Sequence, residues 1–218
     1  MIQVLDHGFV RLVDHMGDDS RIVQAARVSY GAGTKTKRED EALIDYLMRN
    51  RHTSPMEAVV FQFHVKLPIF VARQFVRHRT ARLNEVSLRY SEAKDEFYIP
   101  KTWRAQDTKN KQGSVVADLD HAGMTALLIN QCEDSMDRYR TLINGGAARE
   151  MARMVLPINL YTEWYWQMDL HNLFHFLRLR LDAHAQFEAR EYAKATAELV
   201  KPIVPAAWAA FERHQLAR

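Results

Sequence analysis

Alternation of apolar and polar residues predicts the strands of this chain. In residues 59–66, apolar side chains alternate with more polar ones, the pattern of a strand with one buried face. Residues 159–168 are rich in aromatics and form a second candidate strand. Two shorter strands, at 2–5 and 9–13, are predicted on either side of a turn at residues 6–8.

Apolar residues spaced by three or four positions predict helices in much of the remaining chain. The first has its cap within residues 18–20 and runs to Arg27, and a loop at 31–36 separates it from an amphipathic helix through 43–48. Further helices are predicted at 114–143, 148–154, 170–180 and 186–200. Both kinds of secondary structure are therefore expected.

Two segments between the strands carry polar residues. Residues 52–57 read as a proline turn, in which Ser54 and Glu57 have the spacing of a capping box. Pro68 is expected to open a helix, because proline is common at a first helical position. This helix would carry on one face the four residues Gln74, Arg77, His78 and Ala81.

Residues 77–90 hold an unusual concentration of cations. The segment contains four arginines and one glutamate, a charge of 4 − 1 = +3, which equals the net charge of the whole chain. Arginine forks suit a phosphate, a carboxylate or the edge of a heterocycle. The alternative is a basic run that complements the dipole of a helix C-terminus in solvent. Within it, residues 85–90 alternate polar with apolar, which predicts a half-buried strand or extended segment.

Composition limits the classes of protein that remain. The 218 residues are long enough for a sizeable core and show no linker, so a single domain over 1–218 is expected. A net charge of +3 is too small for a committed binder of polyanions. The lone cysteine, Cys132, excludes an intramolecular disulfide and lies on an apolar helical stripe, as a buried structural thiol would.

The first residues lack the apolar core of a signal peptide, and no run of about 18 apolar residues exists for a membrane span. A cytoplasmic protein that binds neither membrane nor nucleic acid is expected. With only 8 glycines and no GxGxxG fingerprint, a dinucleotide would not be held in the Rossmann manner.

The arginine-rich segment carries a resemblance to a known family. Residues 77–90 resemble the signature RHRxxSxNxxSxRY of the flavin-dependent thymidylate synthases, and the matching residues are Arg77, His78, Arg79, Asn84, Ser87, Arg89 and Tyr90. Arg82 stands where the signature has serine. The resemblance extends from the amino terminus to about Tyr192 and includes RLRLDAHAQFE near its end.

This resemblance implies a fold and a reaction. The fold would be a single α+β domain with a mostly antiparallel sheet and packed helices, assembled as a homotetramer whose active sites are shared between chains. The reaction would be the reductive methylation of dUMP to dTMP, with methylenetetrahydrofolate as carbon donor and NADPH-reduced FAD as hydride source. Such a route needs no protein nucleophile, because the ring is polarised electrostatically.

The resemblance also assigns roles to individual residues. Arg180 would be the catalytic residue, since a permanent cation there promotes ionisation of the uracil imide. The nucleotide would be held by Gln74, Arg77, Glu85, Ser87, Leu88, Arg89, Arg153 and Arg180. The flavin would be lined by His52, Ser54, Glu57, Arg77, His78, Arg79, Asn84, Glu85, Asp169, His171, His175 and His184. The family commonly has asparagine and arginine where Asp169 and His171 stand.

Two other functions remain open on the sequence alone. A nucleic-acid-binding module would place arginines of the 77–90 segment on phosphates and would bind with steep salt dependence. A metal hydrolase would use His171 and His175, four residues apart on a helix, together with His184 and Glu188. Asn172 follows the first histidine, however, where the zinc-hydrolase motif HExxH requires glutamate.

Overall fold

The computed structural model of the chain describes residues 1–28 and 37–216. Its main sheet has five antiparallel strands in the order β1-β2-β3-β7-β4. Their bounds are β1 Ile2–Val4, β2 Gly8–Met16, β3 Val60–Pro68, β7 Tyr161–Asp169 and β4 Arg82–Glu85. The strands predicted at 2–5, 9–13, 59–66 and 159–168 are confirmed, and β2 continues to Met16.

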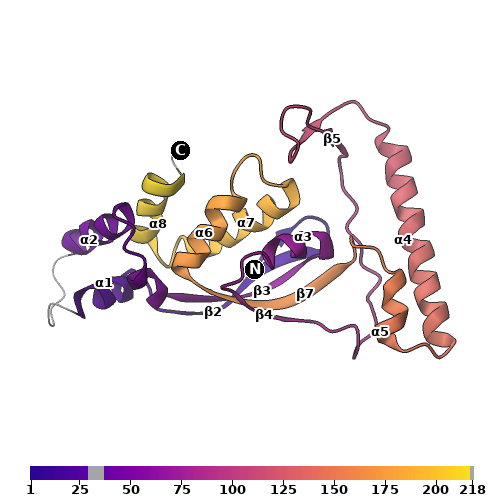
Figure 1. Cartoon of the computed structure of the whole chain (residues 1–218), viewed down its shortest axis with the longest axis horizontal. Coiled ribbons are helices and arrows are strands. Elements are labelled where there is room, and N and C mark those ends of the chain that lie inside the picture. Colours follow the sequence, from indigo (N-terminus) through magenta and orange to yellow (C-terminus); the bar gives the residue numbers. More distant parts are fainter. Residues whose placement is uncertain (29–36, 217–218) are drawn as a thin grey trace.

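Eight α-helices are present in the described part of the chain. They are α1 Asp19–Arg27, α2 Lys37–Arg49, α3 Ile69–Phe75, α4 His121–Asn144, α5 Arg149–Ala152, α6 Leu170–Arg180, α7 Phe187–Val200 and α8 Pro205–Phe211. Figure 1 shows α3, α6 and α7 on one face of the sheet, with α1, α2 and α8 beyond one end and α4 beyond the other. None of the helices in the described residues is long and apolar enough to cross a bilayer.

The alternation in β3 buries its inward side chains under these helices. Phe61 and Phe63 are fully buried, and the ring of Phe63 lies 5.9 Å from that of Trp166 on β7. Phe75 at the end of α3 packs against Trp166 and against Phe176 of α6, whose ring centroid is 4.7 Å away. Each such side chain contributes about 1.5–3 kcal/mol by leaving water. The α+β fold with an antiparallel sheet is therefore confirmed.

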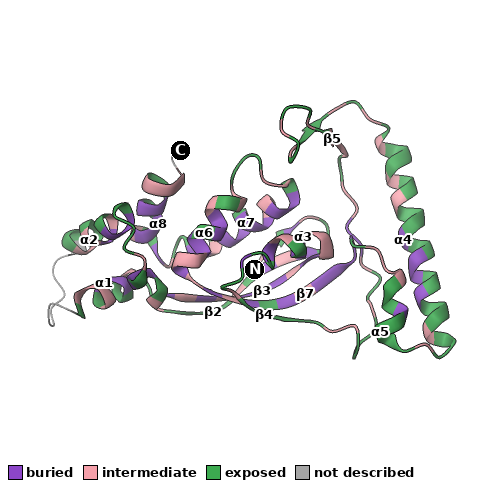
Figure 2. Cartoon of the chain, viewed as in Figure 1, coloured by how far each residue is buried: buried purple, intermediate pink, exposed green. Residues whose placement is uncertain are grey.

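A second, smaller core lies under α4. Cys132, Met136 and Tyr139 pack there with Leu160 and Ala152. Figure 2 shows that the rest of α4 is largely exposed. The predicted burial of Cys132 is confirmed. A two-stranded sheet of β5 Arg104–Gln106 and β6 Ser114–Val116 precedes this helix.

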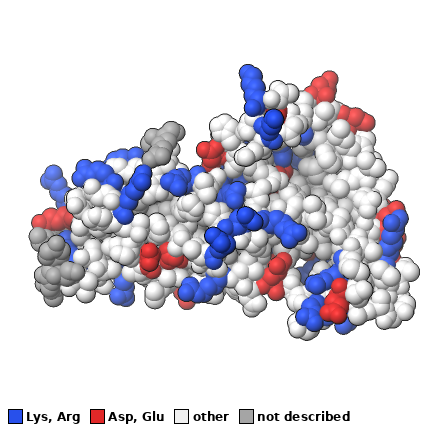
Figure 3. Space-filling view, in the orientation of Figure 1, with Lys and Arg blue, Asp and Glu red and all other residues white. Residues whose placement is uncertain are grey.

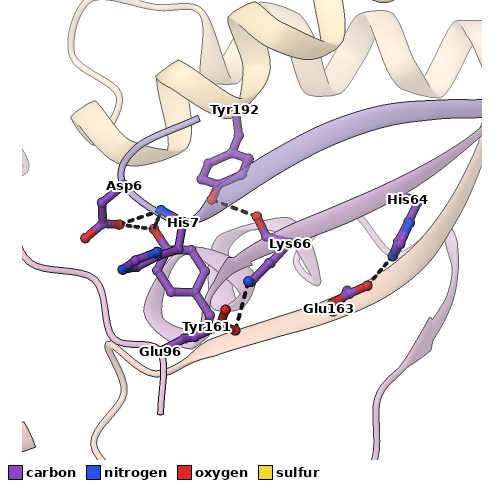
Figure 4. Close-up of polar contacts among 8 residues, drawn as sticks. All are labelled: Asp6, His7, His64, Lys66, Glu96, Tyr161, Glu163 and Tyr192. Carbon is purple, nitrogen blue, oxygen red and sulfur yellow. Dashed lines mark hydrogen bonds and ion pairs between the residues drawn. The ribbon is translucent and has the colours of Figure 1, made fainter. Parts of the chain in front are cut away.

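Polar contacts fasten the turn between β1 and β2 to the sheet (Figure 4). Asp6 accepts a hydrogen bond of 2.5 Å from the hydroxyl of Tyr161, and Tyr192 of α7 donates to the main-chain oxygen of Lys66. A Cβ on Gly8 would lie 1.9 Å from the Tyr192 hydroxyl, so a larger residue does not fit there. The turn, β3, β7 and α7 thus form one fixed unit.

The long helix predicted at 114–143 is wrong at its start. Residues 114–116 pair with 104–106 as a strand, and Asp120 then caps α4 by accepting a hydrogen bond from the main-chain nitrogen of Gly123. Local spacing does not reveal this pairing, since the partner lies ten residues upstream. The loop predicted at 31–36 lies outside the described residues.

The helix expected from Pro68 is shorter than predicted. Pro68 is its N-cap, and the helix ends at Phe75, so Arg77 and Ala81 follow in turns and do not share a helical face with Gln74. His78 still reaches the same partner as Gln74, as described below. The capping box is also wrong: residues 54–58 form a 3₁₀ turn without a side-chain cap, and Thr53 is the N-cap.

The strand predicted at 85–90 is wrong. The strand lies at Arg82–Glu85 instead, because only these residues pair with β7. The main-chain nitrogen of Val86 donates to Glu163, after which Tyr90 and Ser91 turn back on Ser87. Val86 and Tyr90 are consequently exposed, not buried on an inner face.

Candidate active site

Helices α3 and α6 converge over the middle of the sheet. Pro68 pairs with Tyr161 and Val60 pairs with Asp169, so the two helices leave the paired strands at opposite ends. Each helix then runs back over the same face, as Figure 1 shows, and their carboxyl ends meet. Arg180, the last residue of α6, lies at this meeting point, where a cation is also favoured by the helix dipole.

The guanidinium of Arg180 is held by groups on and after α3. Its Nη1 donates to Oε1 of Gln74 at 2.8 Å, and its Nη2 donates to the main-chain oxygen of Gln74 at 3.2 Å. Its Nε donates to Nε2 of His78 at 3.3 Å. Burial lowers the pKa of Arg180, but a guanidinium stays charged in proteins. Three of its five N–H groups are used, and two are available to a ligand.

The imidazole of His78 is buried and neutral. Burial lowers its pKa to about 4, with further contributions from the charges of Arg180 and His175. Because Nε2 accepts from Arg180, the ring proton resides on Nδ1. The ring packs edge-on against Phe176 and lies 5.8 Å from the ring of His175. His78 therefore acts as an acceptor that orients Arg180.

Further hydrogen bonds continue from Gln74 into the protein. Nε2 of Gln74 donates to Oε1 of Gln186 at 2.5 Å, and Nε2 of Gln186 donates to Oε2 of Glu188 at 3.1 Å. Glu188 is buried and forms a 2.5 Å ion pair with Arg104 of β5. No substrate or flavin role was predicted from sequence for Gln186, Glu188 or Arg104. Two of them lie in RLRLDAHAQFE, so the motif was the available signal.

A cavity of about 320 Å³ brings together three of the predicted flavin residues, His52, His171 and His175. Arg51 and Arg178 also line it, and Arg178 lies 3.4 Å from Nδ1 of His175. Imidazole and guanidinium donors fit the phosphates and carbonyl oxygens of a flavin dinucleotide. Pockets for drug-sized ligands span about 300–1,000 Å³, so this cavity suits a part of FAD. The residues that line this cavity therefore fit part of such a cofactor.

The two arginines that flank His78 are exposed. Within residues 1–28 and 37–216, neither Arg77 nor Arg79 has a hydrogen-bonding or ion-pairing partner for its guanidinium. Figure 3 shows Lys and Arg side chains gathered across the middle of this face of the molecule. These donors are therefore free for an anionic ligand.

The nucleotide residues predicted after the turn lie along β4 and beyond it. Glu85 accepts a 2.5 Å hydrogen bond from Thr162 of β7, a residue that the sequence analysis did not identify. Arg89 forms an exposed 3.0 Å ion pair with Glu150 of α5, while Leu88 packs on the small core. Four of the residues in this region are exposed: Arg82, Asn84, Arg89 and Arg153. The predicted nucleotide residues on and after β4 thus form a second group, none of which is hydrogen-bonded to Arg180 in this structure.

Other predicted flavin residues are not brought together. Asp169 caps α6 by accepting from the main chain and the side-chain amide of Asn172. His184 lines a different cavity, of about 1070 Å³, and bonds to Asp182. Ser54 and Glu57 are exposed on the 3₁₀ turn. In a single chain these side chains do not form one pocket with His52.

Cys132 is not placed for chemistry. Its Sγ accepts a 3.2 Å hydrogen bond from Nδ2 of Asn159 inside the small core, and burial raises its pKa. In the described residues, no group of three or more His, Cys, Asp or Glu side chains is arranged to hold a metal ion. The metal hydrolase therefore has no ligand set there.

Fold and site together define the class of protein. A half-buried guanidinium held by an amide and a neutral imidazole, next to free arginines and an imidazole-lined cavity, is suited to an enzyme that binds small phosphorylated ligands. The family of thymidylate synthase complementing proteins matches residues 11–206. The chain belongs to this family.

Curated relatives agree over nearly the whole chain. The flavin-dependent thymidylate synthase of Thermus thermophilus is 66% identical, over 99% of this chain and 79% of the relative. That of Treponema denticola is 61% identical, over 98% of this chain and 82% of the relative. The resemblance inferred from the signature is confirmed, and with it the flavin-dependent class of thymidylate synthase.

A solved structure has the same fold. A UMP/dUMP methylase from Streptomyces cacaoi, crystallised with 5-Br dUMP, superposes with a TM-score of 0.90 at 32% identity and covers 99% of both chains. The same methylase with 5-Br UMP gives a TM-score of 0.88. The match extends over the full length, so it includes both the sheet and the α4 region.

Proposed function

We propose that this protein converts dUMP to dTMP, taking the carbon from methylenetetrahydrofolate and the reducing equivalents from NADPH through FAD. The observation that carries the proposal is the Arg180 guanidinium, fixed by Gln74 and His78 at the junction of α3 and α6. The names of the relatives, which are flavin-dependent thymidylate synthases, support the same reaction. The buried thiol of Cys132 argues against a cysteine adduct.

In this reaction Arg180 acts on the uracil ring. Its two remaining N–H groups donate to the ring carbonyls and stabilise the negative charge that develops when the imide ionises. Because Gln74 and His78 already hold the other three N–H groups, the charge needs little reorganisation when the ring changes. The phosphate of dUMP is bound by exposed arginines: Arg77 and Arg153, whose guanidinium groups have no partner in the described residues, and Arg89, which uses only its Nε for Glu150 there.

The cofactor, when bound, supplies the reducing equivalents that a methyl group requires. His52, His171 and His175 hold part of it in their shared cavity, and the arginines Arg51 and Arg178 offset its phosphate charge. His78 touches both regions, through the ring of His175 and the guanidinium of Arg180. His78 thereby connects the proposed flavin region with the proposed nucleotide region.

The active enzyme is, in this proposal, a homotetramer built from single-domain subunits. Support comes from the scatter of the candidate residues over one chain, which leaves Ser87, Arg89 and His184 without a common pocket with His52. Large apolar side chains are also exposed, among them Leu127 at 72%, Val116 at 82% and Tyr90 at 80%. In the proposed tetramer, contacts with other chains would cover these side chains.

The test is product formation by the purified protein. Incubation with dUMP, methylenetetrahydrofolate and NADPH should yield dTMP, and the protein should show the yellow absorption of an oxidised flavin before NADPH is added. Omission of each substrate in turn provides the control. A colourless protein that binds polynucleotides with steep salt dependence would contradict the proposal and favour the nucleic-acid-binding alternative.

Assembly is tested separately by light scattering and by mixing. Two inactive variants, His52→Ala and Arg180→Ala, should regain part of the activity on mixing if a shared site takes these residues from different chains. A fully active monomer at the same concentration would contradict the shared site.

A further inference from the structure

The hydrogen bonds that leave Arg180 end at a buried carboxylate. They run from Arg180 to Gln74 at 2.8 Å, from Gln74 to Gln186 at 2.5 Å and from Gln186 to Glu188 at 3.1 Å. Glu188, only 3% exposed, also accepts from Arg104 and from the hydroxyl of Tyr98 at 3.2 Å. The reaction proposed above uses only the first of these bonds.

The two ends of this series determine the direction of every bond in it. Arg180 can only donate, and an ionised carboxylate can only accept. Each glutamine between them offers one carbonyl oxygen and one NH₂ group. All bonds are satisfied only when each glutamine points its carbonyl oxygen toward the Arg180 end of the series and its NH₂ group toward the Glu188 end. The structure has this arrangement.

A reversed Gln74 amide would damage the site. Its NH₂ group would then face the guanidinium, and two donors would meet without an acceptor, which is costly in a half-buried position. Arg180 would keep only its bonds to His78 and to the main-chain oxygen of Gln74. Its guanidinium could then turn away from the ligand.

Groups around Glu188 keep it an acceptor. Arg104 contacts Oε1 at 2.5 Å and is itself placed over the ring of Phe187, 4.7 Å from its centroid. Burial and the charge of Glu188 raise the pKa of Tyr98, so its hydroxyl stays protonated and donates. The other carboxylate oxygen, Oε2, is left to Gln186.

We propose that Glu188 is a positioning residue for the thymidylate reaction, which fixes the amides of Gln186 and Gln74 and thereby orients Arg180 toward the uracil ring. Glu188 touches neither substrate nor flavin in this scheme. The inference rests on the proposed function, because that function assigns Arg180 to the nucleotide.

The first test is Glu188→Gln, which keeps the shape of the side chain but lets it donate or accept. The direction of the bonds is then no longer fixed. We expect the affinity for dUMP, measured by calorimetry on the flavin-loaded protein, and kcat/KM for dUMP to fall by roughly tenfold each. The flavin spectrum should stay unchanged. Unchanged dUMP affinity and kcat/KM would overturn the proposal.

The second test separates bond direction from charge. In the double variant Gln186→Glu with Glu188→Gln, the carboxylate at position 186 accepts from Gln74, and the new amide at 188 donates to it. The direction toward Arg180 is restored, while Arg104 still lacks its ion pair. We expect dUMP affinity and kcat/KM to recover to within about threefold of the original protein.

A double variant that folds with the original melting temperature but stays as weak as Glu188→Gln would overturn the proposal, because the lost ion pair would then explain the defect. If the double variant does not fold, the dUMP affinity of Glu188→Gln alone decides. An original protein that neither binds nor methylates dUMP would instead contradict the proposed function, so the two failures can be distinguished.

Discussion

Arginines occur in two contrasting settings in this molecule. Arg180 is half-buried and donates three hydrogen bonds to Gln74 and His78. Arg77 and Arg79, on either side of His78 in the chain, are exposed and have no such partners in the described residues. Arg77, His78 and Arg79 follow α3 directly, and Arg180 bonds to this His78. The fold therefore fixes the guanidinium of Arg180 and leaves those of Arg77 and Arg79 free.

This difference separates two functions of a cation. A guanidinium held by its own chain loses its side-chain conformational entropy during folding, before a ligand binds. It therefore acts as a preorganised charge. An exposed guanidinium keeps all its donors for a ligand and is ordered only on binding, which lowers the net gain. We therefore assign stabilisation of the reacting ring to Arg180, and capture of phosphate to Arg77 and its exposed neighbours.

The largest effect is expected from Arg180→Ala. Loss of a preorganised charge should lower dTMP formation by about 100-fold or more while the flavin stays bound. Arg180→Lys should recover little, because an ammonium lacks the planar fork that meets Gln74 and His78. Turnover and the flavin spectrum are measured together. Full activity in Arg180→Lys would show that charge alone suffices.

Arg77→Ala should weaken ligand binding without unfolding the protein. Because the side chain is exposed, we expect the melting temperature to stay within a degree or two. The KM for dUMP should rise by about tenfold, the value of one charge-assisted hydrogen bond. Arg138→Ala provides the control, since Arg138 is exposed on α4 and, among the residues that the structure describes, pairs only with Asp134, at 3.5 Å. An equal rise in KM in both variants would mean a general charge effect.

His78→Gln tests whether the buried imidazole beside Arg180 is neutral, through the pH dependence of the free energy of unfolding. The pKa of His78 is about 4 in the folded chain, against 6.5 unfolded, so the unfolded chain takes up a proton first as the pH falls. The stability due to the neutral ring is full above pH 6.5 and declines toward pH 4, by up to about 3 kcal/mol.

The variant should therefore lose less stability than the original protein between pH 6.5 and 5, as measured by urea unfolding. Some slope should remain, because burial and the charges of Arg178 and His171 also lower the pKa of His175. His184→Gln, at an exposed ring, is the control for replacing a histidine away from Arg180. Equal slopes in His78→Gln and the original protein would contradict the neutral buried ring.

The smallest effect on turnover is expected from Cys132→Ala. The variant should turn over within about twofold of the original rate and lose about 1 kcal/mol of stability, as a buried contact and the bond from Asn159 disappear. Asn159 keeps its bond to the main-chain oxygen of Tyr98. A folded but inactive variant, or a trapped adduct between Cys132 and uracil, would contradict a route without a protein nucleophile.

Helices and strands were predicted correctly where burial against their partners produces a regular pattern of apolar residues in the local sequence. Alternation in residues 59–66 identified β3, because one face of that strand is buried along its whole length. Helix α6 was predicted with its observed bounds, 170–180, since its apolar spacing reflects continuous packing on the sheet. The strand predicted at 85–90 failed because pairing with β7 stops at Glu85, which only the tertiary structure determines.

The signature predicted candidate site residues, but it did not predict how they are arranged. Signature spacing identified Arg77 and His78, but nothing local distinguishes the free arginine from the buried histidine. The contact between Gln74 and Arg180 joins residues 106 positions apart, and that between Gln74 and Gln186 joins residues 112 apart. Amide orientation depends on such distant partners, so the RLRLDAHAQFE motif includes Glu188 but does not indicate its role.

The register of β3 against β7 has a consequence for how the protein folds. Pro68 pairs with Tyr161, so this central pair of strands closes a loop of more than ninety residues. Contacts so distant in sequence are slow to form. Because α3 and α6 continue directly from these two strands, closure of that loop also brings Gln74 to Arg180. A chain in which β3 and β7 have not yet paired therefore also lacks the hydrogen bonds that hold Arg180 in place.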